Sequence, residues 1–223
     1  METSIIIETV VKVIVVLAVF SALAGFTTYI ERKVLAFMQR RLGPTNVGPY
    51  GLLQIAADGI KLFTKEDIIP ANVNKPIFMV APIITAATAF IAMSAVPFFP
   101  EFELFGYTVR PIISDINVGV LFVMSVGAVG LYGPLLGGMS SANKWALLGG
   151  ARTAIQLLSY EVVSGLSLLA PLMMVGSLSL IDINNYQAGG ISNWIIWSQP
   201  LAFILFTIAG FAETNRTPFD LLE

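Results

Sequence analysis

The sequence has 223 residues, of which 56% are hydrophobic and only 12% are charged, with a formal net charge of −2. A soluble domain carries about twice that share of charged residues, so a water-facing surface would be hard to build from this chain. The mean hydropathy of +0.82 agrees with this, and the composition therefore places the chain in a lipid bilayer.

The residue types that are missing exclude several chemistries. The sequence contains no cysteine and no histidine. It therefore has no disulfide framework, no thiolate nucleophile, no cysteine-held iron–sulfur cluster, and none of the usual ligands of haem or zinc. We expect the chain alone to bind no cofactor, and any electron carriers to belong to a partner. The small net charge, without a long charge run, gives no support for nucleic-acid binding.

Charge-free windows predict five transmembrane helices, because about 20 apolar residues cross the hydrocarbon core of a bilayer. The predicted spans lie near residues 5–30, 77–99, 117–138, 153–175 and 194–212. A cleaved signal peptide is the alternative for the first span, but Glu2 precedes any Lys or Arg and the apolar stretch is too long. The expected fold class is an all-α integral membrane protein: one transmembrane domain over residues 1–223, a bundle of about five helices with the start of a sixth segment at the C-terminus.

Most Lys and Arg residues fall on one side of these spans. Seven of them are in the loop 31–76, and Lys144, Arg152 and Arg216 lie on the same side. The positive-inside rule makes this side cytoplasmic and places the N-terminus outside.

The loop 31–76 is too long for a simple connector and too apolar for a solvated one. Between Tyr50 and Phe63 apolar residues recur at helical spacing, with Asp58 and Lys61 elsewhere around the helix. This pattern predicts an amphipathic helix at the membrane surface or under another subunit. A helix that only anchors the loop fits the periodicity equally well.

Glu161 is the one charged residue inside the fourth predicted span. If that helix enters the membrane near Thr153, the carboxylate lies roughly 12 Å along it. Such a charge costs on the order of 2–3 kcal/mol unless it is hydrated, paired or protonated. The position suits a group that binds and releases protons. The alternative is a span shifted to residues 162–181, with Glu161 at the interface.

Two further groups of polar residues stand on the cytoplasmic side. Arg152 and Gln156 are spaced i, i+4 and can face the same partner, although Arg152 alone also fits an anchor that reaches the headgroups. After the fifth span, the Thr217–Pro218 pair predicts a non-helical hinge before a new helix. Arg216 can neutralise only one of Glu213, Asp220 and Glu223, which predicts a proton-accepting network. An ordinary capped loop is the alternative.

Six strings of the sequence stand out, and most are long and carry charged residues or Gly-Pro pairs: ERK at 31–33, QRRLGP at 39–44, VGPYGLLQ at 47–54, KLFTKE at 61–66, RTAIQLLSYEV at 152–162 and AETNRTPFDL at 212–221. In these strings the sequence resembles the H subunits of bacterial NADH:quinone oxidoreductase (complex I). The resemblance runs over the whole chain.

The resemblance implies a subunit of a proton-translocating enzyme in the bacterial inner membrane; a mitochondrial inner membrane is the less favoured setting. It implies a proton path through Glu161, Glu213, Asp220 and Glu223. It also implies a quinone cavity and its mouth at Glu31, Arg32, Arg152 and Arg216, with quinone as a substrate shared with partner subunits. The implied partners are the other membrane and peripheral-arm subunits, quinone and the lipid bilayer.

The family also continues past the last matching string, so we expect the sequence to be truncated at the C-terminus. One alternative function is the membrane anchor of an energy-converting hydrogenase or formate hydrogenlyase, whose strings match less closely. The other alternative is a non-redox transporter or structural scaffold. Co-purification with iron–sulfur subunits that oxidise NADH would distinguish the leading function from both.

Overall fold

The computed structural model describes residues 2–98, 102–104, 107–109, 112–215 and 219. The chain divides into two compact units, Met1–Ile68 and Ile69–Glu223. In the first unit the two helices contact each other, and in the second unit the helices from residue 75 onward contact one another. That the whole chain forms a single transmembrane domain stays a prediction.

The first unit consists of a long helix and a short one. Helix α1 (Glu2–Met38) is followed by a 3₁₀ turn, η1 (Pro49–Gly51), and by α2 (Gln54–Thr64). The first predicted span ended at residue 30, but α1 continues to Met38. No Gly or Pro occurs between residues 31 and 38, so nothing in this stretch breaks a helix even where charged residues leave the apolar window.

The turn between these helices depends on glycine. Gly51 has a φ of 79°, and a Cβ atom there would lie 2.1 Å from the carbonyl oxygen of Pro44. Only glycine permits this conformation and this close approach. Helix α2 then packs on α1 at Gly25, where an added Cβ would lie 2.5 Å from Cγ2 of Ile55. The helix predicted between Tyr50 and Phe63 is therefore present, starting at Gln54.

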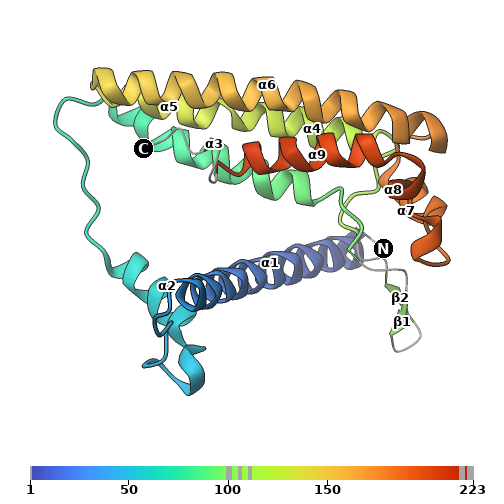
Figure 1. The fold of residues 1–223 in the computed structure, drawn as a ribbon, viewed down its shortest axis with the longest axis horizontal. Helices are drawn as coiled ribbons and strands as arrows, with labels where there is room; N and C mark the ends of the chain where they lie inside the picture. The colour runs from blue at the N-terminus through green and yellow to red at the C-terminus, as the bar shows by residue number, and fades with distance from the viewer. Residues whose placement is uncertain (1, 99–101, 105–106, 110–111, 216–218, 220–223) are drawn as a thin grey trace. The chain divides into compact units, whose positions relative to one another are not determined.

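The second unit is a bundle whose helices run alongside one another in Figure 1. Its long elements are α3 (Lys75–Met93), α4 (Gly119–Gly130), α5 (Tyr132–Ser140), α6 (Lys144–Val175) and α9 (Pro200–Glu213). Its short elements are the strands β1 (Phe102–Leu104) and β2 (Tyr107–Val109), the helices α7 (Leu180–Tyr186) and α8 (Ile195–Ser198), and the 3₁₀ turn η2 (Ile191–Asn193). The two strands form an antiparallel hairpin with Phe102 opposite Val109, a detail that was not predicted from the sequence.

Two helix ends differ from the sequence expectation for identifiable reasons. Helix α6 begins at Lys144 rather than near 153, because Asn143 caps it by accepting a hydrogen bond from the backbone N–H of Trp145 at 3.0 Å. Helix α9 begins only at Pro200 rather than near 194, because proline is tolerated at the first turn of a helix and interrupts one elsewhere. The preceding residues form the separate helix α8.

The described helices confirm the class of helical membrane protein. Four segments are long and apolar enough to cross a membrane, and α9 is a shorter apolar helix. The four segments are Glu8–Met38, Lys75–Met93, Gly119–Ser140 and Lys144–Val175.

The interior of the bundle is built from small residues. Ala81, Ala209 and Ala212 are among the most buried side chains, whereas many Leu, Ile and Phe side chains are exposed. Helices α5 and α6 approach closely at Gly138 and Gly150, since a Cβ added to either glycine would lie 3.3 Å from the other residue's Cα. Small residues at the contacts with large ones outside are the usual arrangement of helices in a bilayer.

Candidate functional site

A cavity of about 390 Å³ inside the bundle is lined by two carboxylates, Glu161 and Glu213. Glu161 comes from α6 and Glu213 from the last residue of α9, and α3, α4 and α5 supply the opposite walls. The other lining residues are Thr85, Thr88, Ala89, Ala92, Val123, Gly127, Gly130, Leu131, Pro134, Leu157 and Asn215. The structure therefore brings together two of the residues that the sequence predicted for a proton path.

Glu161 lies deeper along its helix than the sequence suggested. Because α6 begins at Lys144 and ends at Val175, Glu161 stands about 25 Å from one end and about 21 Å from the other. Its side chain is half-buried, whereas that of Glu213 is more exposed. That the span begins near Thr153, rather than being shifted to residues 162–181 with Glu161 at the interface, stays a prediction.

Gln156 holds the end of α9 against α6. Its side-chain amide donates to the carbonyl oxygens of Phe219 at 2.9 Å and Ala212 at 3.4 Å, and the side chain is only 8% exposed. One turn later, the ring of Tyr160 meets that of Phe219 edge-on, with 5.1 Å between centroids. The hydrogen bond to Ala212 holds the end of α9, and with it the neighbouring Glu213, beside α6. The i, i+4 spacing in the sequence paired Gln156 with Arg152 instead, and this role was missed.

Arg152 lies in a separate, larger groove. This groove, of about 1280 Å³, runs between α3, α5 and α6, and Arg152 is its only charged residue among those the structure describes. The groove and the carboxylate cavity share Thr85, Ala89 and Pro134 in their walls. Arg152 and Gln156 therefore lie in different environments: Arg152 is exposed to the groove, and Gln156 is buried against backbone carbonyls.

Arg216, Asp220 and Glu223 lie outside the described residues, as does the predicted hinge at Thr217 and Pro218. The wider acidic network that the sequence predicted at this end of the chain therefore stays a prediction.

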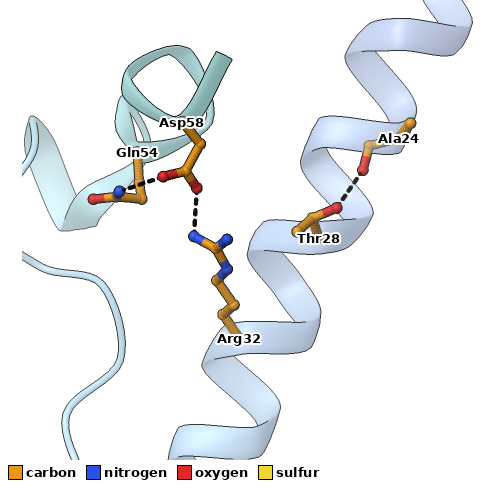
Figure 2. A network of polar contacts seen from close by, with 5 residues as sticks. All are labelled: Ala24, Thr28, Arg32, Gln54 and Asp58. Carbon is orange, nitrogen blue, oxygen red and sulfur yellow. Dashed lines mark hydrogen bonds and ion pairs between the residues drawn. The ribbon is translucent and has the colours of Figure 1, made fainter. Parts of the chain in front are cut away.

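The first unit carries a second polar cluster, shown in Figure 2. Arg32 on α1 forms an ion pair with Asp58 on α2, and Gln54 donates to the other carboxylate oxygen of Asp58 at 2.9 Å. Hydrogen bonds from Gln54 and then from Arg32 lower the pKa of Asp58 below the ordinary value of an aspartate. The cluster borders a pocket of about 290 Å³ between α1 and α2.

This cluster extends the sequence prediction for Arg32. Asp58 and Gln54 were not among the predicted site residues, because the ion pair joins positions 26 residues apart. Their i, i+4 spacing on an amphipathic helix was the only available signal. Glu31 precedes Arg32 on α1 but is not part of the described lining of the pocket.

Tyr29, which lies on α1 one turn before Arg32, connects α1 to the η1 turn that precedes α2. The hydroxyl of Tyr29 donates to the carbonyl oxygen of Tyr50 at 2.8 Å, and Tyr50 itself has a positive φ of 55°. The turn around η1 is thus held to α1 by a hydrogen bond as well as by the packing of Ile55 on Gly25. Arg32 and Gln54, which belong to the strings 31–33 and 47–54 that carried the resemblance, both contact Asp58 in this unit.

Comparison with known proteins identifies the family to which these motifs belong. The model of a family described as NADH dehydrogenase matches residues 11–223. The chain belongs to this family.

Several curated relatives are named as the H subunit of NADH-quinone oxidoreductase. The one from Wolinella succinogenes is 78% identical over 99% of this chain and 67% of its own length. The one from a Nitratiruptor species is 74% identical over 100% of this chain and 68% of its own length, and the one from Helicobacter hepaticus is 70% identical over 98% and 66%. The family resemblance stated from the sequence is confirmed.

Proposed function

We propose that this chain is the H-type membrane subunit of a bacterial respiratory NADH:quinone oxidoreductase. In that role it helps form the quinone-binding cavity and the entry of the proton path that couples quinone reduction to proton translocation. Family membership and relatives that are 65–78% identical support the assignment to the oxidoreductase. The observation that carries the proton-path part is the Glu161–Glu213 cavity.

The chemistry of this cavity suits proton exchange. Two carboxylates on one cavity repel each other when both are charged, and a proton on either one relieves that repulsion. A change of charge elsewhere in the complex then shifts the proton occupancy of the pair. Quinone reduction, which consumes electrons and protons, is such a change. Asp220 and Glu223 extend the pair into a longer path in this proposal.

The quinone contacts are proposed at cationic side chains. A quinone headgroup offers carbonyl oxygens, which accept hydrogen bonds from a guanidinium group. Arg32 borders a pocket, and its side chain is 47% exposed despite its ion pair with Asp58. Arg152 stands in the large groove. Together with Glu31 and Arg216, these residues form the cavity and its mouth in our proposal.

The remaining parts of the proposal concern partners and membrane. A chain without Cys or His relies on peripheral-arm subunits for its electron carriers, and other membrane subunits and the lipid bilayer cover its exposed apolar faces. The loop 31–76 faces the cytoplasm, the N-terminus lies outside, and the membrane is the bacterial inner membrane. The positive-inside distribution of Lys and Arg supports this orientation.

The test replaces Glu161 by Gln in the assembled complex, because Gln keeps the size and hydrogen-bonding capacity and removes the titration. We expect assembly and NADH oxidation by an artificial electron acceptor to persist, while NADH:quinone turnover and proton translocation fall strongly. Glu213→Gln should behave likewise. Asp115→Asn, at an exposed acid outside the cavity, is the control and should keep both activities.

Full turnover and translocation in an assembled Glu161→Gln complex would exclude the proton role. A complex that fails to assemble would show that Glu161 is a structural partner of a neighbouring group instead.

A further inference from the structure

Three spaces follow one another along the bundle of the second unit. The groove that contains Arg152 shares Thr85, Ala89 and Pro134 with the carboxylate cavity. On its other side the carboxylate cavity shares Val123 with a third space, of about 240 Å³. This third space lies toward the α7 end of the bundle, where Leu180 and Ile183 help to line it. The carboxylates therefore stand between two neighbours of different chemistry.

The third space is apolar throughout the lining that the structure describes. Leu168 and Leu172 of α6, Val120 and Met124 of α4, and Phe206 of α9 are among its walls. Its volume would accommodate water, but a protein-bound water needs two to four polar partners, and none of these side chains offers one. We therefore call this space the dry cavity.

The polar groups of α6 nearest to the dry cavity are already engaged. The hydroxyl of Ser164 donates to the backbone carbonyl of Glu161 at 2.9 Å, and that of Ser167 donates to the carbonyl of Ser164 at 2.7 Å. Both side chains are buried, and neither belongs to the described lining of the dry cavity. Because neither hydroxyl lines the dry cavity, neither offers a hydrogen-bonding partner to water inside it.

The opposite side of the carboxylate cavity is different. The wall shared with the groove includes the hydroxyl of Thr85, and the groove beyond it contains Ser141 and the exposed guanidinium of Arg152. The hydroxyls of Thr85 and Ser141 donate to backbone carbonyls of their own helices. Their oxygens nevertheless line these spaces and can accept hydrogen bonds from water, and the guanidinium of Arg152 can donate to it. The contrast gives the carboxylate cavity one side that supports water and one side that excludes it.

We propose that the dry cavity is a hydrophobic seal that confines proton exchange of Glu161 to the Arg152 side of the bundle. Val123, which lines both cavities, is the partition, and Leu168 and Leu172 complete the seal from α6. Apolar constrictions block conduction by excluding water. The inference rests on the proposed proton role of Glu161, and it adds the direction from which protons reach that residue.

The test places a polar side chain in the seal of the assembled complex, reconstituted in lipid vesicles. A pH gradient is imposed without NADH or quinone, with the membrane potential clamped by potassium and valinomycin, and its decay is followed with a pH-sensitive dye. We expect several-fold faster decay in Leu168→Asn than in wild type. Leu169→Asn, which puts the same group on the neighbouring, 52% exposed position, is the matched control and should decay at the wild-type rate.

Two more variants complete the experiment. Val123→Thr adds a hydroxyl without changing the shape, so it carries the test if Leu168→Asn does not assemble; it should also speed the decay. Adding Glu161→Gln to either variant should restore slow decay, since the leak passes through that carboxylate.

Assembled Leu168→Asn and Val123→Thr complexes that hold the gradient as long as wild type would overturn the seal. A fast leak that survives Glu161→Gln would overturn the link between the seal and the carboxylate cavity. Because the leak is measured without substrate, it is separate from the turnover measurement that decides the proposed function.

Discussion

Asp58 shows how one side chain fastens two helices. It accepts hydrogen bonds from Arg32 of α1 and Gln54 of α2, and so ties the amphipathic helix to the long one. We expect Asp58→Asn to loosen α2, because the neutral amide loses the ion pair. Spin labels on Leu35 and Phe63, both exposed, would show a broader distance distribution between α1 and α2. Asp67→Asn, an exposed acid without this ion pair, is the control.

The same contact sets a pH dependence. The pKa of Asp58 is lower when α2 is docked than when it is free, so docking is stabilised above the free carboxyl pKa of about 4. That stabilisation is lost as the pH falls through the lowered pKa of the docked state. The distance between the two labels should therefore stay narrow at pH 5 and broaden only on stronger acidification, as in Asp58→Asn. Broadening already near pH 6 would contradict this assignment.

At the scale of the single residue, the sequence identified residues with functional chemistry more readily than it identified the residues they contact. Glu161 was predicted because a carboxylate inside an apolar span needs a reason to be there. Gln156 was not recognised as an anchor, since its partner Phe219 lies 63 residues further along the chain. A pattern indicates the face of a helix on which a residue lies, but tertiary packing decides what meets that face.

At the scale of the element, glycines set how closely helices approach. A Cβ at Gly150 would lie 2.8 Å from the carbonyl oxygen of Pro134. We expect Gly150→Val to force α5 and α6 apart and to lower stability by about 1–3 kcal/mol, the usual cost of overpacking. Gly149→Val is the matched control, because nothing lies within 4 Å of a Cβ at that position.

The measurement is the thermal midpoint and yield of the assembled complex. Equal midpoints for Gly149→Val and Gly150→Val would show that the close contact between α5 and α6 does not limit stability.

Four of the five predicted spans correspond to segments long and apolar enough to cross a membrane, in the predicted order, and the fifth corresponds to the shorter apolar helix α9. Their ends were less predictable, for physical reasons. A hydropathy window finds the part of a helix that suits lipid, whereas α1 and α6 continue through charged residues to Met38 and back to Lys144. Helix α9 is shorter than its window because Pro200 divides the segment. Backbone hydrogen bonding and hydropathy therefore set different boundaries.

At the scale of the whole molecule, we propose that the loop 31–76, which contains seven Lys and Arg residues, is a docking surface for the peripheral arm. Arg40 and Arg41 follow the end of α1, and Nε of Arg41 donates to the side chain of Gln39 at 2.6 Å. Reversing both charges, Arg40→Glu with Arg41→Glu, should release the arm at lower salt than in wild type, because repulsion replaces attraction. The readout is NADH-oxidising activity that sediments with membranes across a salt series.

Lys12→Glu is the control for added negative charge, because Lys12 lies near the N-terminus, which the positive-inside rule places on the opposite side of the membrane. If the arm of the double variant still sediments at high salt, Arg40 and Arg41 are not part of the docking surface.

The small-residue interior also governs which substitutions the chain tolerates. In a water-soluble protein the large buried side chains are the constrained ones, and the surface is free to vary. Here the large side chains, such as Leu166 and Phe203, are exposed, and one apolar shape can replace another there at small cost. The constrained positions are those that cannot grow, such as Gly133, where a Cβ would lie 1.8 Å from the hydroxyl of Thr85. A library of single substitutions should therefore tolerate exchanges among exposed Leu, Ile, Val and Phe, and should reject added volume at closely packed positions such as Gly133 and the buried Ala212.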